Sequence, residues 1–270
     1  MNKVALITGV SSGIGKETAK LMVKNGFKVY GASRRMSKMS TLESEGVRLL
    51  EMDLTVEESI QQTVTQVLSE EKRLDVLVNN AGYGSYGALE DVPIEEAKYQ
   101  FEVNIFGLAR LIQLVLPQMR QQQSGRIINI SSIGGSFGEP HGAWYHATKF
   151  ALEGLSDSLR MELKQFGIEV VIIKPGAIKT EWNTIARNKL VEVSGKTTYK
   201  KLVHKHYKML ESADKQGSQP IVVAKSILKA ATVANPKTRY AVGKGAKLLL
   251  FIRSVSPDKL FDKLLLSQIK

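Results

Sequence analysis

The feature that most constrains the fold is a glycine-rich loop between an apolar run and a helical pattern. The stretch ITGVSSGIG places Gly9, Gly13 and Gly15 after the run Val4–Ile7 and at the start of the pattern Ile14–Asn25. Glycine lets the backbone approach a pyrophosphate, and the positive end of the following helix favours an anion. The spacing is G-x3-G-x-G, which differs from the G-x-G-x-x-G of many dinucleotide-binding loops. The loop therefore predicts a strand, a phosphate-binding turn and a helix.

Short apolar runs alternate with longer helical patterns through the first two thirds of the chain. The expected strands are Val4–Ile7, Lys28–Ala32, Val47–Met52, Val76–Asn79, Arg126–Ile130 and Glu169–Lys174. The expected helices are Ile14–Asn25, Val56–Ser69, Glu95–Gln122 and Tyr145–Phe166. Each run is apolar enough for burial on both faces, and such alternation is typical of parallel sheets. We expect an α/β fold: a doubly wound, Rossmann-type sheet of about seven mainly parallel strands with helices on both faces.

The pattern loosens after Pro175 and Gly176, but no linker divides the chain, so we expect a single Rossmann-fold domain over residues 1–270. Residues 180–218 are polar and lysine-rich, which predicts a substrate loop or helical flap above the sheet. A helix is expected at Pro220–Ala234, a short strand at Arg239–Val242, and a C-terminal helical extension over 243–270 that breaks at Pro257.

Composition excludes several classes of protein. The 270 residues include no cysteine, which removes disulfides and cysteine-based metal sites and suits a reducing compartment. No apolar run approaches the roughly 20 residues that a membrane-spanning helix needs. The N-terminal stretch lacks the pattern of a signal peptide, because glycine and serine interrupt its apolar run. We therefore expect a cytoplasmic protein.

The net charge of +12 comes from the last third of the chain, because residues 185–270 contain 18 Lys and Arg against 5 Asp and Glu. We favour a solvated lysine surface over this part. Peripheral attachment to an anionic membrane is the second interpretation, since the stretch KGAKLLLFIRSVSPDKLFDKLLL has both basic and apolar faces. Nucleic-acid binding is not expected, because no recognised binding module accompanies the charge.

A possible reactive pair lies in the stretch GAWYHATKF, where Tyr145 and Lys149 are four residues apart. At this spacing both side chains share one helix face, and an ammonium near a phenol is expected to lower the pKa of the phenol. Tyr145 could then exchange a proton with a substrate oxygen. Ser131 and Ser132 follow an expected strand, so a serine hydroxyl could donate a hydrogen bond to the same oxygen.

The turn after the second expected strand indicates the cofactor. The stretch GASRRMSK supplies Ser33, Arg34 and Arg35 and no acidic residue. An acidic side chain here would accept hydrogen bonds from ribose hydroxyls, whereas arginine suits a 2′-phosphate. We therefore predict NADP(H).

Five motifs in order, TGVSSGIG, NNAG, VNIFG, SS before YHATK, and KPGAIKT, resemble those of the short-chain dehydrogenase/reductase family over about residues 3–180. The stretches GFKVYGASR, NNAGYGSYGALED and KPGAIKTEW are most similar to its steroid- and retinol-type branch. The resemblance implies hydride transfer between NADP(H) and a carbonyl or secondary alcohol of a small, hydrophobic molecule.

The resemblance also implies the site residues. The catalytic residues would be Tyr145 as general acid/base, Lys149 as the cation that tunes it, Ser132 as the carbonyl-polarising group and Asn104 as the holder of a relay water. The cofactor would contact Gly9, Ser11, Ser12, Gly13, Ile14, Gly15, Ser33, Arg34, Arg35, Asp53, Leu54, Asn80, Ala81, Gly82, Tyr145, Lys149, Pro175, Gly176, Ile178 and Thr180. Thr148 stands where serine is common.

The histidines are expected to have other roles. No metal site is predicted, and His204 and His206 are expected to be solvated because no acidic or cysteine partner adjoins them in the sequence. His146 would point about 100° away from Tyr145 around a helix.

Substrate recognition is expected in the segment after Thr180 and in the loops Tyr83–Gly87 and Gly134–Gly142, with Trp144, Trp182 and Ile185 as candidate apolar contacts. The family implies a homodimer or homotetramer paired through the helices at Glu95–Gln122 and Tyr145–Phe166. Two alternatives stay open: a nucleotide-binding sensor or scaffold without turnover, and a reductase of carrier-bound 3-oxoacyl groups.

Overall fold

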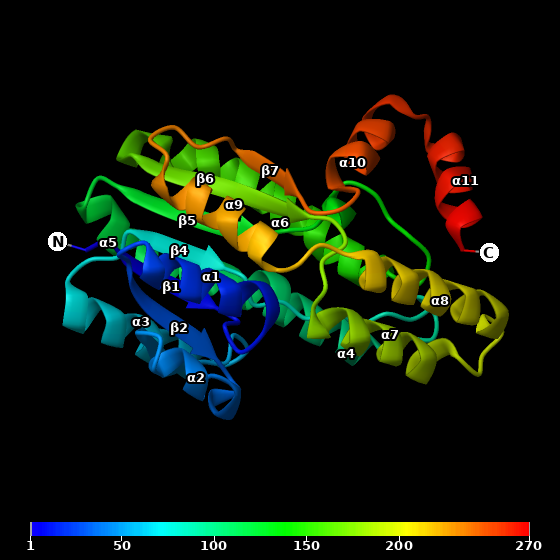
Figure 1. The fold of residues 1–270 in the computed structure, drawn as a ribbon, viewed down its shortest axis with the longest axis horizontal. Helices are drawn as coiled ribbons and strands as arrows, with labels where there is room; N and C mark the ends of the chain where they lie inside the picture. The colour runs from blue at the N-terminus through cyan, green and yellow to red at the C-terminus, as the bar shows by residue number, and fades with distance from the viewer. Residues whose placement is uncertain (1, 270) are drawn as a thin grey trace.

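Seven parallel strands form one sheet in the described part of the chain, residues 2–269 of a computed structural model (Figure 1). Their order is β3-β2-β1-β4-β5-β6-β7. The strands are β1 (Val4–Thr8), β2 (Lys28–Ser33), β3 (Val47–Glu51), β4 (Val76–Asn79), β5 (Gly125–Ile130), β6 (Ile168–Pro175) and β7 (Arg239–Val242). After the edge strand β3 the chain crosses over one face of the sheet to β4, which pairs with β1 on the side away from β2, so the strand order reverses beside β1. Open α/β sheets bind ligands at such a switch point.

Helices cover both faces of the sheet. One face packs on α1 (Gly13–Lys24), α2 (Ser40–Glu43) and α9 (Ile221–Thr232), and the other on α3 (Glu57–Glu71), α5 (Gly107–Gln121) and α6 (Ala143–Leu163). Each interface is an apolar cluster of buried side chains, which explains why the strands are apolar on both faces. The expected doubly wound α/β fold is confirmed.

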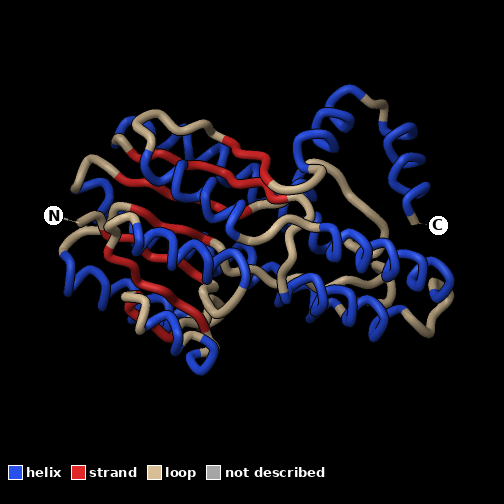
Figure 2. The backbone as a smooth tube through the Cα atoms, viewed as in Figure 1, coloured by secondary structure: helices blue, strands red, loops and turns tan. Residues whose placement is uncertain are grey.

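The remaining helices gather beyond the carboxyl ends of the strands (Figure 2). The flap consists of α7 (Glu181–Ser194) and α8 (Lys200–Gln216), so the helical form of the expected flap is correct. A C-terminal hairpin of α10 (Ala246–Val255) and α11 (Asp258–Gln268) turns at Pro257, as the sequence predicts. The hairpin projects on the same side of the molecule as the flap (Figure 1).

The long helix expected at Glu95–Gln122 is interrupted. It consists of α4 (Ile94–Phe101), a wide π-helical turn over Glu102–Phe106, and α5. A π turn adds a residue to the helical repeat and often marks a functional position. No helix within residues 2–269 is both long and apolar enough to cross a membrane.

Candidate active site

The glycine loop between β1 and α1 forms a cradle that side chains would fill. Gly9 and Gly13 have φ angles of +73° and +55°, which favour glycine. A Cβ on Gly9 would lie 2.8 Å from the Cα of Ala81, and a Cβ on Gly15 would lie 2.3 Å from the carbonyl oxygen of Gly9. Gly9 and Gly13 line the open cleft, whereas Gly15 lets the helix approach the loop from below. The loop therefore fits a dinucleotide that needs close contact with the backbone.

The two arginines after β2 extend along the rim of this cradle. The Arg35 guanidinium donates a hydrogen bond of 2.8 Å to the Ser11 hydroxyl and lies 3.6 Å from the Glu181 carboxylate. The Arg34 guanidinium lies 3.7 Å from the Asp53 carboxylate. Both arginines are about half exposed, so their remaining N–H groups can reach a ligand. The turn after β2 contains no acidic residue, but the fold places the carboxylates of Asp53 and Glu181 beside its arginines.

The predicted cofactor residues lie together along one cleft of about 820 Å³ above the strand ends. Every residue of the predicted set lines this cleft except Gly15, which lies beneath the loop. Ser132 lines it as well, whereas Asn104 is buried behind it. The residues present therefore fit an extended dinucleotide.

Tyr145 and Lys149 lie on the first two turns of α6, and the Lys149 ammonium is 5.8 Å from the centre of the Tyr145 ring. Burial raises the pKa of Tyr145 to about 12, although the hydrogen bond with Ser132 acts against the shift. Burial lowers the pKa of Lys149 to about 8. Burial therefore outweighs any lowering of the Tyr145 pKa by Lys149 in this structure, and the expected tuning of Tyr145 by Lys149 stays a prediction. Tyr145 is a protonated acid at neutral pH.

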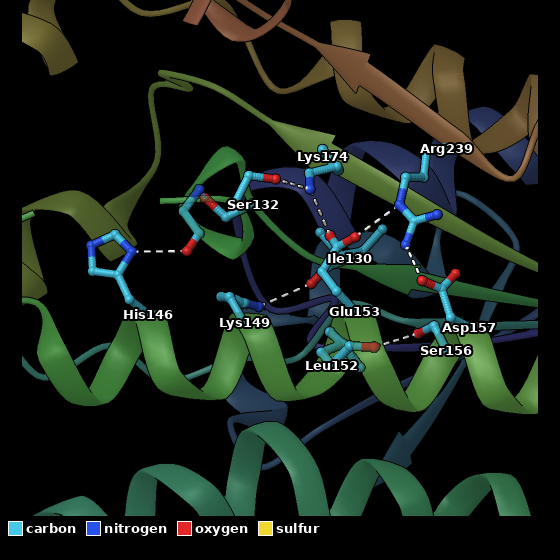
Figure 3. Close-up of polar contacts among 12 residues, drawn as sticks. Ile130, Ser132, His146, Lys149, Leu152, Glu153, Ser156, Asp157, Lys174 and Arg239 are labelled. Atoms are coloured by element: carbon cyan, nitrogen blue, oxygen red, sulfur yellow. Dashed lines mark hydrogen bonds and ion pairs between the residues drawn. The ribbon is translucent and has the colours of Figure 1, made fainter. Parts of the chain in front are cut away.

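Lys149 is held by the backbone rather than by the phenol. Its ammonium donates a hydrogen bond of 2.9 Å to the carbonyl oxygen of Ile130 at the end of β5 (Figure 3). One turn further along α6, Glu153 forms ion pairs with Lys174 on β6 at 3.1 Å and with Arg239 on β7 at 2.9 Å. This ionic cluster fixes α6 to the sheet directly behind the reactive pair.

Asn104 lies in the π turn and holds the loop that follows β4. Its amide donates to the Tyr83 carbonyl at 2.8 Å and to the Thr148 hydroxyl at 3.1 Å, and its Oδ1 accepts from the Tyr83 backbone N–H at 2.8 Å. Thr148 therefore supplies the same kind of hydroxyl that serine would. Ser132 accepts a hydrogen bond of 3.1 Å from the Gly134 N–H, which orients its side chain.

The outer part of the cleft is largely apolar, although Asn183, Arg187 and Asp214 line it as well, and it comes from three separate parts of the chain. The flap contributes Trp182, Ile185, Ala186, Met209, Leu210 and Ala213; the hairpin contributes Leu249, Ile252, Leu264, Leu265 and Ile269; and the two predicted loops contribute Tyr83, Gly84, Tyr86, Gly134, Phe137 and Glu139. The segment after Thr180 and both loops line this wall, and their role in substrate recognition stays a prediction. Sequence reasoning missed the part that the hairpin contributes.

Three sequence expectations about individual side chains need correction or detail. Trp144 does not line the cleft, because its ring packs against Phe101 at 6.3 Å on the outer side of α6. His206 is fully buried, with its Nδ1 3.0 Å from the Nδ1 of His141, whereas His204 is exposed as expected. The spacing of Val203, His206 and Leu210 on one helix face was a signal for this burial.

His146 points away from Tyr145 toward the loop before α6. Its Nδ1 lies 2.8 Å from the Gly134 carbonyl oxygen, and its Nε2 accepts the Glu139 backbone N–H at 3.2 Å. Both bonds tie the loop to the helix that holds Tyr145, so the imidazole is a structural support for the site. The side chain also reaches the wall of the cleft.

Comparison with known proteins places this geometry in a family. The family model described as short chain dehydrogenase matches residues 3–190. The chain belongs to the short-chain dehydrogenase family. The predicted resemblance is thereby confirmed at the level of the family, while the steroid- and retinol-type branch stays a prediction.

Similar short-chain dehydrogenases share almost the whole length of the chain. A protein of Bacteroides thetaiotaomicron named 3-ketodihydrosphingosine reductase is 40% identical over 96% of this chain and 95% of its own. A protein of Ornithobacterium rhinotracheale named NADPH-dependent 3-dehydrocapnine reductase is 32% identical over 99% of this chain and 98% of its own. A crystal structure of a short-chain dehydrogenase from Streptomyces avermitilis is 33% identical over 97% of this chain and 94% of its own, with a TM-score of 0.80.

Proposed function

We propose that this short-chain dehydrogenase is an NADP(H)-dependent oxidoreductase that interconverts a carbonyl group and a secondary alcohol on a long, hydrophobic substrate. The observation that carries the proposal is the single cleft that joins the dinucleotide cradle, the Ser132–Tyr145–Lys149 group and an apolar outer wall. A small polar substrate would leave most of that wall in contact with water, which is unfavourable for apolar surface.

The chemistry at the junction follows from the protonation states. A nicotinamide cofactor bound along the cradle supplies the hydride for reduction. Ser132 donates a hydrogen bond to the substrate carbonyl oxygen and stabilises the negative charge that develops there. Tyr145, protonated because burial raises the pKa of its phenol, donates the proton that completes the alcohol. Lys149, positively charged below pH 8, would then stabilise the phenolate that remains and would also bind the ribose of the cofactor.

The choice of NADP(H) rests on Arg34 and Arg35. Two guanidinium groups at the end of β2 favour the charge of a 2′-phosphate, and their hydrogen bonds to Ser11 and Tyr99 hold them at the rim of the cradle. The Ornithobacterium relative is named as NADPH-dependent, which agrees with this choice.

The relatives support a lipid-like ketone as the substrate. Both named reductases act at a carbonyl of position 3, and a sphingoid ketone combines that carbonyl with a long alkyl chain. The apolar side chains of α8, α10 and α11 that line the outer cleft suit such a chain. We therefore propose a long-chain 3-ketone as the substrate class.

The proposal is tested by following NADPH and NADH oxidation with long-chain 3-ketones, short ketones and a carrier-bound 3-oxoacyl group, using wild type and Tyr145→Phe. We expect NADPH-dependent turnover of the long-chain ketone that falls at least 100-fold in the variant, while NADPH affinity stays within about twofold. Tight cofactor binding without turnover of any compound would instead favour a nucleotide-binding sensor. Preference for the carrier-bound group would favour the acyl reductase.

We also propose a peripheral membrane contact through the hairpin. Its inner side chains line the cleft, while Leu248, Phe251 and Val255 of α10 recur at helical spacing and are each more than 60% exposed beside Lys244 and Lys247. Exposed apolar groups flanked by lysines suit an anionic lipid surface. Sedimentation with vesicles that contain anionic lipid should capture wild type at low salt, and capture should fall in Phe251→Ser. Equal sedimentation with neutral and anionic vesicles would contradict the contribution of charge.

For the assembly, we propose a homo-oligomer paired through α4, α5 and α6. Phe106 in the π turn, and Phe150 and Met161 on α6, are large apolar side chains that are about half exposed or more. An isolated exposed apolar residue needs no explanation, but three on the elements named above favour a self-association surface. Analytical ultracentrifugation should show a dimer or tetramer for wild type. Phe150→Glu should be a monomer, because the new carboxylate would be buried in the interface.

A further inference from the structure

The wall of the cleft beside Tyr145 includes a carboxylate that the proposed reaction does not use. Glu139 lies in the segment between β5 and α6 and lines the cleft together with Tyr86. Its Oε1 accepts a hydrogen bond of 2.9 Å from the Tyr86 hydroxyl. The Tyr86 ring lies 5.7 Å from the Tyr145 ring, and Glu139 acts after burial in raising the pKa of Tyr145. The carboxylate is therefore close to the proposed position of the reacting carbonyl.

Imidazoles supply the positive charge that the protein itself offers to Glu139: burial raises the pKa of its carboxyl, but the hydrogen bond with His146 and the charges of His206 and His146 lower it by more. Within residues 2–269 no Lys or Arg forms an ion pair with Glu139, and its nearest basic atom is the Nε2 of His146 at 3.8 Å. Burial lowers the pKa of His146, but Glu139 and the Gly134 carbonyl raise it by more. An imidazole still loses its proton as the pH rises past its pKa, whereas an alkyl ammonium stays charged at neutral pH. A buried carboxylate is stabilised by a cation that stays charged, and Glu139 lines the cleft in which a substrate ammonium could lie.

Aromatic rings surround the same part of the cleft. The Trp182 ring lies 4.9 Å from the Tyr145 ring and 6.2 Å from the Tyr86 ring. Trp182 can approach so closely because residue 84 is glycine: a Cβ there would lie 2.1 Å from the Trp182 ring. Aromatic faces attract organic cations, and a carboxylate beside them adds a charged hydrogen-bond acceptor. Together they form a site for an amine.

We propose that Glu139 binds an ammonium group of the substrate close to the reacting carbonyl, so that the enzyme selects amino ketones over uncharged ketones of equal length. This inference rests on the proposed function, because it assumes that a ketone is reduced at Ser132 and Tyr145. It assigns Glu139 to substrate recognition and leaves the proton transfer to Tyr145. Sphingoid ketones have such an ammonium group, whereas simple fatty ketones do not.

The test compares Glu139→Gln with wild type on two substrates, a long-chain 2-amino-3-ketone and the 3-ketone of equal chain length without the amine. Wild type should show a kcat/KM that is about 10- to 100-fold higher for the amino ketone, the range of a charge-assisted hydrogen bond. In Glu139→Gln this preference should vanish, because kcat/KM for the amino ketone falls by that factor relative to kcat/KM for the uncharged ketone. Glu95→Gln, which removes an exposed carboxylate on α4, is the matched control and should behave as wild type.

Two outcomes would overturn the ammonium site. Glu139→Gln could retain the preference for the amino ketone, or it could lose activity equally on both substrates. Tyr86→Phe provides an independent variant that keeps the ring and removes the hydrogen bond to Glu139. We expect it to reduce the preference by several-fold without abolishing it, and an unchanged preference would count against the site.

A binding measurement separates this inference from the proposed reaction. Trp182 lies in the cleft, so its fluorescence should report the binding of a long-chain amine and of a long-chain alcohol in the presence of NADP⁺. The amine should bind more tightly to wild type, and Glu139→Gln should remove the difference. Selective amine binding without turnover of any ketone would overturn the proposed reaction and keep the site. Turnover of ketones without amine selectivity would overturn the site and keep the reaction.

Discussion

Glu153 lies one turn of α6 beyond Lys149, and its charge opposes the effect of burial on that lysine. Burial lowers the pKa of Lys149 to about 8, and Glu153 acts in the opposite direction. Replacing Glu153 by glutamine should therefore lower the pKa of Lys149 further below 8. Since the protonated lysine supports Tyr145 and is lost as the pH rises through its pKa, the alkaline limb of kcat/KM should move to lower pH. A pH profile from 6 to 10 measures this shift.

The same substitution leaves Lys174 buried without its ion-pair partner. Loss of stability is expected, because an unpaired buried charge is costly. The double variant Glu153→Gln, Lys174→Met removes both charges and should recover part of the melting temperature while keeping the shifted pH profile. An alkaline limb that stays in place in both variants would show that Glu153 does not tune Lys149.

Cofactor selectivity should depend on Arg35. In Arg35→Ala the KM for NADPH should rise about 10- to 100-fold, because a charged hydrogen bond to the 2′-phosphate is lost, while the KM for NADH changes little. Lys215→Ala, which removes an exposed cation on α8, is the control. Equal increases in the KM for NADPH and for NADH would mean that Arg35 stabilises the glycine loop through Ser11 and does not bind the 2′-phosphate.

The contact between Gly84 and Trp182 should be sensitive to a single methyl group. Gly84→Ala places a Cβ where the Trp182 ring lies, so the ring must move away from Tyr145. We expect a KM for the long-chain substrate that is raised about 10-fold, with kcat less affected, and a shifted Trp182 emission spectrum. Gly154→Ala on α6, where a Cβ meets no neighbour, is the matched control. Unchanged emission would show that the ring adapts in place.

The buried pair of His141 and His206 should make stability depend on pH. Burial and the neighbouring His206 lower the pKa of His141 to about 4, and burial lowers that of His206. The unfolded chain therefore binds more protons than the folded chain between about pH 6.5 and pH 4, so the contribution of the pair is complete above pH 6.5 and is lost as the pH falls through this window.

Urea unfolding at pH 7.5 and pH 5 measures the effect. Wild type should lose more unfolding free energy than His206→Leu over this interval, because the variant lacks one of the two histidines whose pKa is lowered. His204→Leu, which changes an exposed histidine two residues away, should keep the wild-type dependence. If His206→Leu also keeps the wild-type dependence of stability on pH, titration of the pair is not the cause of that dependence.

The sequence was sufficient for those features that depend on local pattern and motif order. The strands, the glycine loop and the placing of Tyr145 and Lys149 on one helix face follow from apolar runs, glycine positions and the i, i+4 rule. The Pro257 break in the tail followed from the missing N–H of proline. Each of these features is decided by residues that are close in the sequence.

Other features depend on packing between distant segments. The Glu139 carboxylate meets Tyr86 across 53 residues, and the imidazoles of His141 and His206 meet across 65. The pKa of Tyr145 rises because burial of the whole site outweighs local charges, which a tyrosine and lysine in sequence do not reveal. Leu264 and Leu265 of α11 line the cleft because the hairpin turns at Pro257 and brings α11 back toward the flap.

The boundary at the end of β6 separates two kinds of chemistry along the chain. Most residues of the dinucleotide cradle and all members of the reactive group precede Pro175, whereas most of the apolar outer wall follows it. A chimera of two family members joined at this proline would therefore take its cofactor cradle from one parent and most of its outer cleft wall from the other. If the proposed function is correct, divergence of the residues after Pro175 alone would change the substrate range and leave the cofactor cleft unchanged.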